Sequence, residues 1–141
     1  SGTSVAVDVL LRLALLLGRE DYRRRAEAAL EGLSGLLEQM PAAFGRLLGA
    51  LDFHLGRPRE VAIVGRPDAP DTRALVDALY SVYLPNRVIA GGPGGEDASL
   101  VPLLEGRGMV DGRATAYVCE GYVCKSPTTE PGELLRQLRE G

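Results

Sequence analysis

A nearly apolar run close to the N-terminus constrains the fold of this chain more than any other feature. Within residues 5–17 only Asp8 and Arg12 carry a charge. The hydroxyl groups of residues 1–4 can cap the start of a helix here, and Gly18 can end it. One apolar stripe has members about one helical turn apart, namely Val5, Val9, Leu13 and Leu16. Leucines cover the other sides as well, and such a helix is normally buried on nearly all sides.

Two further helices are expected in the first third of the chain. Segment 20–39 carries apolar residues at three- and four-residue steps, and its charged residues face away from them. The next helix begins near Pro41, which suits a first helical turn, and it stops at Gly56 and Pro58. Both helices are apolar on one side only, so each has one face to bury.

These helices leave a packing problem, because the first helix needs partners on several sides. The second half of the chain, another copy, or a missing part of a larger protein must cover the remaining apolar surface. We divide the chain into an all-α segment, residues 1–57, and a small α/β domain, residues 58–141.

The second half has the pattern of an α/β domain. Residues 59–65 are a short β-branched run closed by glycine, which predicts a buried parallel strand. A helix over 72–83 and a second strand over 87–91 complete a βαβ unit with a right-handed crossover. We therefore predict a short parallel sheet. The remaining expected elements are a short helix, a third strand and a closing helix, at 99–104, 114–119 and 133–139.

Composition excludes several classes of function. The chain has 141 residues and a net charge of −3, which disfavours a basic nucleic-acid binder. The apolar run 5–17 is shorter than the roughly 20 residues that span a bilayer, and no basic segment precedes it as in a secretory signal. We therefore expect a cytoplasmic protein without nucleic-acid or membrane partners. Two cysteines and one histidine leave little material for an active site, and no cofactor or metal is expected.

The glycine run 91–95 stands where a nucleotide phosphate would bind, directly after a strand. Its spacing differs from the dinucleotide fingerprint, and it lacks the lysine and hydroxyl residue of a P-loop. Glu96 and Asp97 would also repel a phosphate. A turn is the favoured interpretation, and phosphate binding is the alternative.

Cys119 and Cys124 form the most chemically distinctive pair. Their separation is too long for a redox motif with two intervening residues. The favoured interpretation is two small, partly buried thiols at a strand end. A redox-active or disulfide-forming pair is the second interpretation, with Gly121 permitting the tight turn. A zinc half-site shared between chains is the third.

His54 follows Asp52 by two residues, so the two side chains lie on different faces of a helix. A packed or surface histidine is the favoured interpretation, and a general base is the alternative. The run 23–25 of arginines is expected on the solvated side of its helix, because nearby acidic residues neutralise it.

Two segments resemble a known family. They are SGTSVA at residues 1–6 and YVCEGYVCKSP at residues 117–127, and between them ALDF at 50–53, REVAIVG at 59–65 and LPNRV at 84–88 follow in the same order. The chain thereby resembles, over nearly its whole length, spermatogenesis-associated protein 20 and its bacterial relatives. Gly121 departs from the family pattern, in which a polar residue such as Asn is more common.

The resemblance implies a much longer parent protein. Members of the family combine a thioredoxin-like domain, an α/α toroid similar to N-acylglucosamine 2-epimerases and six-hairpin glycosidases, and a small α/β end. The chain is similar to only the last toroid helices and the α/β end. An inner-ring position in the toroid would explain the apolar first helix.

Three functions follow as hypotheses. The favoured one is a non-catalytic C-terminal structural or interaction segment, whose partner is the remainder of the parent or a second copy, bound through exposed apolar helices. The alternative is a fragment of a carbohydrate-active enzyme, with a carbohydrate ligand and His54 or Asp52 as contributors. The third is a thiol redox module that uses Cys119 and Cys124. We do not expect the isolated chain to be a catalyst.

Overall fold

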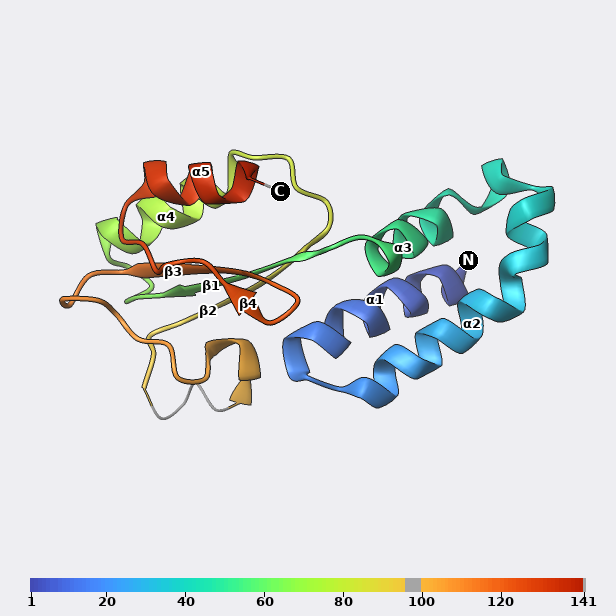
Figure 1. The fold of residues 1–141 in the computed structure, drawn as a ribbon, viewed down its shortest axis with the longest axis horizontal. Coiled ribbons are helices and arrows are strands. Elements are labelled where there is room, and N and C mark those ends of the chain that lie inside the picture. The colour runs from blue at the N-terminus through green and yellow to red at the C-terminus, as the bar shows by residue number, and fades with distance from the viewer. Residues whose placement is uncertain (96–99, 141) are drawn as a thin grey trace. The chain divides into compact units, whose positions relative to one another are not determined.

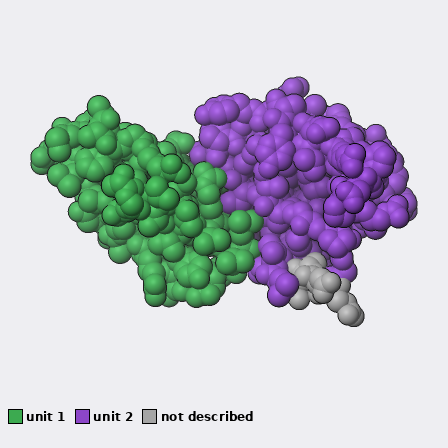
Figure 2. Space-filling view, turned by 180° about the vertical axis from the view of Figure 1, so that it is seen from behind, with its two compact units in different colours: residues 1–58 green, residues 59–141 purple. Residues whose placement is uncertain are grey.

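The computed structural model describes residues 1–95 and 100–140, and it divides the chain into two compact units. Unit 1 comprises Ser1–Pro58 and unit 2 comprises Arg59–Gly141 (Figure 2). Among the described residues, no helix has the length and apolar character needed to cross a membrane.

Unit 1 is entirely helical. Its elements are α1 (Gly2–Leu17), α2 (Glu20–Gln39), the 3₁₀ turn η1 (Pro41–Phe44) and α3 (Gly45–Leu55). Ser1 caps α1 by accepting a hydrogen bond from the Ser4 backbone N–H at 3.3 Å, and Gly18 ends it in the left-handed conformation at φ 62°. The first two helices are confirmed. The third differs at its start, because η1 takes up the turn that follows Pro41 and α3 begins only at Gly45.

The core of unit 1 buries one side of α1 only. Helix α1 packs against both α2 and α3. Its buried residues are Ser4, Val7, Leu11 and Ala14. The stripe that begins with Val5 and Val9 is not the buried one, since these side chains are 41% and 45% exposed. The expectation that α1 is buried on nearly all sides is therefore not met within unit 1, because α2 and α3 cover a single face.

Unit 2 is built on a mixed sheet with strand order β2-β1-β3-β4. The strands are β1 (Arg59–Val64), β2 (Arg87–Gly92), β3 (Thr115–Glu120) and β4 (Val123–Cys124). Strands β1 and β2 pair in parallel and are joined through α4 (Pro70–Tyr80), so the predicted βαβ unit is confirmed.

The predicted parallel sheet is confirmed for β1 and β2 but does not extend to β3, which runs antiparallel to β1. The register gives the reason. Gly92, at the end of β2, and Thr115, at the start of β3, are both partners of Val64 at the carboxyl end of β1. The chain between β2 and β3 thus begins and ends at one edge of the sheet, so β3 must run back along β1.

The sheet of unit 2 is covered on both faces. Helices α4 and α5 (Pro131–Arg139) lie on one face (Figure 1). Their core with the sheet consists of Val61, Ile63, Leu75, Ala78, Leu79, Ala114, Ala116, Val118, Leu134 and Leu138. The 3₁₀ turn η3 (Pro102–Leu104) packs on β1 and β2 and buries Leu103 and Leu104. This turn lies within the short helix expected at 99–104. Residue 99 lies outside the described residues. The closing helix is confirmed as α5.

A tight hairpin joins β3 to β4. Its loop residues Gly121 and Tyr122 both have positive φ, 55° and 67°, as a type I′ turn requires. Glycine and asparagine are the residues that adopt this conformation most readily. Gly121 thus meets the backbone requirement of this turn.

Asp71 ties the start of α4 to the segment before β3. One carboxylate oxygen accepts a hydrogen bond from the backbone N–H of Ala114 at 2.8 Å, and the other accepts from Thr72 at 3.0 Å. The Ala114 hydrogen bond, assisted by that of Thr72, lowers the pKa of Asp71 below its ordinary value. The carboxylate therefore stabilises unit 2 in its charged form.

We predict that Asp71→Asn lowers the stability of the protein at pH 7 and removes a pH dependence. A carboxyl with a lowered folded pKa contributes stability above its unfolded pKa, and this contribution is lost as the pH falls through the folded value. The difference in free energy of unfolding between wild type and variant should therefore shrink below about pH 4. Urea unfolding from pH 7 to pH 2 measures it, with Asp77→Asn on the exposed side of α4 as control. A difference that stays constant with pH would contradict the assignment.

We also predict that Gly65→Ala destabilises unit 2. Gly65 follows β1, and an added Cβ would lie 2.4 Å from Thr72 Oγ1 and 2.8 Å from Ala114 Cβ. The expected loss is about 1–3 kcal/mol, which urea unfolding followed by circular dichroism measures. Gly35→Ala is the matched control, because Gly35 lies within α2 with nothing near its Cβ position. That change should stabilise by about 0.5–1 kcal/mol. Equal effects of the two substitutions would refute the close approach at Gly65.

Candidate functional site

The two cysteines meet across the hairpin at the end of the sheet. Cys119 in β3 and Cys124 in β4 are direct partners in the antiparallel register, and they form a disulfide. The favoured interpretation of two free thiols is therefore wrong, and the cysteines are bonded as in the second interpretation. The two cysteines differ in exposure, since Cys119 is 2% exposed whereas Cys124 belongs to the exposed residues.

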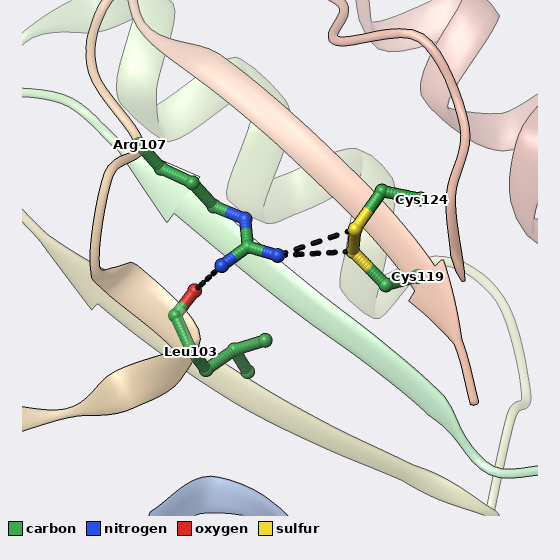
Figure 3. Close-up of a disulfide and its surroundings, with 4 residues drawn as sticks. All are labelled: Leu103, Arg107, Cys119 and Cys124. Carbon is green, nitrogen blue, oxygen red and sulfur yellow. Dashed lines mark hydrogen bonds between the residues drawn. A yellow bond between two sulfur atoms is a disulfide. The ribbon is translucent and has the colours of Figure 1, made fainter. Parts of the chain in front are cut away.

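Arg107 points its guanidinium at the disulfide (Figure 3). Its Nη2 donates to Cys124 Sγ at 3.2 Å and to Cys119 Sγ at 3.3 Å. Its Nη1 donates to the backbone carbonyl of Leu103, which fixes the direction of the side chain. The guanidinium carbon also lies 5.7 Å from the ring centre of Tyr117. A cation thus sits within hydrogen-bond distance of both sulfur atoms.

Sequence reasoning missed Arg107. It lies in the segment between η3 and β3, apart from every motif around the cysteines. Only the return of the chain over the sheet brings it to the sulfur atoms, and no local pattern signals that.

A buried carboxylate shares the face of the sheet that carries the disulfide. Glu60 of β1 is directly opposite Cys119 in β3, and only 4% of it is exposed. Residues opposite each other in an antiparallel pair point to the same face. The face with Glu60 and Cys119 is the one away from α4 and α5, because the alternate residues Val61 and Val118 pack under those helices.

A cavity of about 360 Å³ lies between α4 and the carboxyl ends of β1 and β2. Open α/β sheets bind ligands at this edge. Its lining is mainly apolar and includes Gly91 and Gly92, and it contains the hydroxyl of Thr72, which has no hydrogen-bond partner among the described residues. No lysine or arginine lines it.

The glycines of the run 91–95 meet requirements of the backbone. Gly91 and Gly92 belong to β2, and Gly94 and Gly95 have φ of 80° and 92°. A Cβ on Gly94 would also lie 2.8 Å from a methyl group of Val64. These requirements agree with the turn interpretation. The acidic pair at 96–97 lies outside the described residues.

In unit 1, His54 lines a groove of about 470 Å³ between α2 and α3. Its Nε2 lies 3.6 Å from Glu27 Oε1, and Glu31 and Ser34 add polar groups to the lining. Asp52 does not line this groove. Asp52 and His54 therefore do not share this groove.

The other sequence candidates are structural. Residues 23–25 are exposed, and Arg23 pairs with Glu20 and Glu27 on the surface of α2, which confirms the solvated face. Within residues 1–95 and 100–140, no group of three or more His, Cys, Asp or Glu side chains is arranged to hold a metal ion.

Comparison with known proteins identifies relatives of the whole chain. It is 32% identical over 99% of its length to spermatogenesis-associated protein 20 of Rattus norvegicus, and 33% identical over 98% to that of Homo sapiens. An uncharacterized protein of Caenorhabditis elegans is 29% identical over 95% of the chain. The chain spans only 18% of the length of each of these relatives. No family model and no solved structure matches it.

These identities confirm the resemblance to that family. The chain is homologous to a segment of spermatogenesis-associated protein 20, which is a much longer protein.

Proposed function

We propose that this chain is a non-catalytic structural and interaction segment of a larger protein, and that the exposed side of α1 contacts the remainder of that protein. The observation that carries the proposal is an apolar helix face without a cover in its own unit. Val5 and Val9 are 41% and 45% exposed on α1, although they belong to the most apolar segment of the chain.

The chemistry of α1 argues for a protein partner. A helix of an isolated small domain normally carries polar residues on its outer side, as α2 does with its arginines and glutamates. Helix α1 instead continues apolar around its circumference, and burying such surface is favourable by about 25 cal/mol per Å². An exposed apolar face of this kind marks an interaction site.

The occupant that fits is the rest of the parent chain. Relatives of the whole chain extend far beyond it, since the match spans 18% of their length. We propose in addition that this remainder contains an α/α toroid and a thioredoxin-like domain, with α1 on the inner ring of the toroid. The resemblance described above supports this arrangement.

The groove at His54 favours a second candidate function, a wall of a carbohydrate site. It offers a histidine and the carboxylates of Glu27 and Glu31 beside apolar surface, a combination that suits hydroxyl groups on a sugar ring.

For the α1 proposal, we expect the isolated chain to self-associate at micromolar concentration and to bind the dye ANS, because its apolar face lacks a partner. The double variant Val5→Gln and Val9→Gln should be monomeric by light scattering and should bind less ANS, with an unchanged circular dichroism spectrum. Leu36→Gln, at another exposed apolar residue of unit 1, is the control and should behave as wild type. A wild-type chain that is monomeric and ANS-silent would refute the proposal.

For the carbohydrate candidate, titration of the chain with N-acetylglucosamine should shift the imidazole resonances of His54 in NMR spectra. The shift should disappear in Glu31→Gln if the carboxylate accepts hydrogen bonds from the sugar. Because the chain contains a single histidine, the imidazole resonances can be assigned to His54 directly. Unchanged resonances at millimolar sugar would remove this candidate and leave the structural proposal standing.

A further inference from the structure

We infer that the Cys119–Cys124 disulfide is a thiol–disulfide exchange site for a protein dithiol, in which Cys124 is the sulfur attacked and Arg107 stabilises the departing thiolate. The inference goes beyond the proposed structural role and does not depend on it. It rests on the access to each sulfur, on the position of Arg107 and on the surface of the hairpin.

Access distinguishes the two sulfur atoms. Cys124 lies in β4, the last strand of the sheet order, and it is exposed, whereas Cys119 is 2% exposed. The difference in residue exposure therefore favours attack by an incoming thiolate on Cys124 over attack on Cys119.

The hairpin offers a contact surface for the protein that carries this thiolate. Tyr122 and Val123 are 82% and 75% exposed directly before Cys124. Such apolar side chains gain from burial against a partner, so they favour a protein dithiol over a small thiol.

Arg107 supplies the electrostatic part of the site. A neighbouring cation favours the thiolate over the thiol, and a better-stabilised thiolate leaves a disulfide faster. The 3.3 Å contact from Arg107 Nη2 to Cys119 Sγ places that cation on the buried leaving group, whose charge would otherwise be costly. Among the described residues, titratable groups on the same face of the sheet include Glu60 on β1 and Tyr117 on β3, whose hydroxyl donates to the Gly108 carbonyl at 2.7 Å.

The exchange proceeds in two displacements. A thiolate of the partner dithiol attacks Cys124 Sγ, the bond between Cys124 and Cys119 breaks, and its electron pair leaves on Cys119 as a thiolate beside Arg107. The second partner thiol then loses its proton and attacks the partner sulfur of the mixed disulfide, which releases Cys124 as a thiolate. The two protons of the partner dithiol end on the cysteines. The partner is oxidised to a disulfide by two electrons, which the cysteine pair accepts.

The first experiment measures the pH dependence of alkylation of the reduced chain by iodoacetamide, with mass spectrometry as readout. In Arg107→Gln the midpoint of the profile should rise by about one pH unit, which lowers the rate about tenfold at a pH below that midpoint. Arg107→Lys should retain part of the effect. Arg73→Gln, whose side chain pairs with Asp68 at 3.9 Å on the surface, is the matched control. An unchanged profile in Arg107→Gln with an intact circular dichroism spectrum would overturn the role of Arg107.

The second experiment compares the accessibility of the two cysteines, on which the choice of Cys124 as the attacked sulfur rests, with 5,5′-dithiobis(2-nitrobenzoate). Cys119→Ser leaves only Cys124, which should react at least tenfold faster than Cys119 does in Cys124→Ser. Equal rates, or a faster reaction of Cys119, would overturn the assignment.

The third experiment equilibrates the wild-type chain and Arg107→Gln with glutathione redox buffers and with dithiothreitol. Arg107→Gln should favour the disulfide, because the reduced form loses its stabilised thiolate. A wild-type chain that forms no disulfide in oxidised glutathione, or whose disulfide resists dithiothreitol while folded, would overturn the exchange site. Neither result would affect the test of α1.

Discussion

The α/β unit depends on the complete burial of strand β1. Every residue of Arg59–Val64 is buried, with β2 and β3 on its two edges and with helices or turns on its two faces. This burial includes charged residues. Arg59 pairs through Nη1 with Glu120 and donates through Nη2 to the Glu140 carbonyl at 2.7 Å, while its Nε has no hydrogen-bond partner among the described residues. A buried guanidinium without these partners would be strongly destabilising. The contacts of Arg59 thereby bind the start of β1 to the ends of β3 and α5.

The central position of β1 also creates the disulfide site. Because β3 returns along β1 from the edge at which β2 ends, it runs antiparallel and can continue through a type I′ turn into β4. That hairpin places Cys119 and Cys124 opposite each other, and the pairing with β1 puts Glu60 beside Cys119. Arg107 reaches the same face from the segment that leads into β3. The chemistry of the site is therefore a consequence of the sheet topology.

Much of the fold followed from local pattern. The bounds of α1 could be predicted because a hydroxyl cap and a left-handed glycine act within one helical turn. Helix α2 could be predicted from the three- and four-residue spacing of its apolar residues. The βαβ unit could be predicted because a β-branched run, a turn and an amphipathic helix follow in order. Which face of α1 is buried could not be predicted, since a helix that is apolar all round carries no periodic signal. The buried face, with Val7 and Leu11, was chosen by α2 and α3.

By itself, the sequence determined the helices, the parallel pair of strands and the presence of more apolar surface than the first helices can cover. These properties depend on neighbours within a few residues, and so short-range periodicity and capping report them. The sequence left the joining of Cys119 to Cys124 open as one of three interpretations, and the hairpin decided among them. Only the tertiary structure decided the direction of β3 and the approach of Arg107, because both depend on contacts between distant segments, for which the chain carries no local signature.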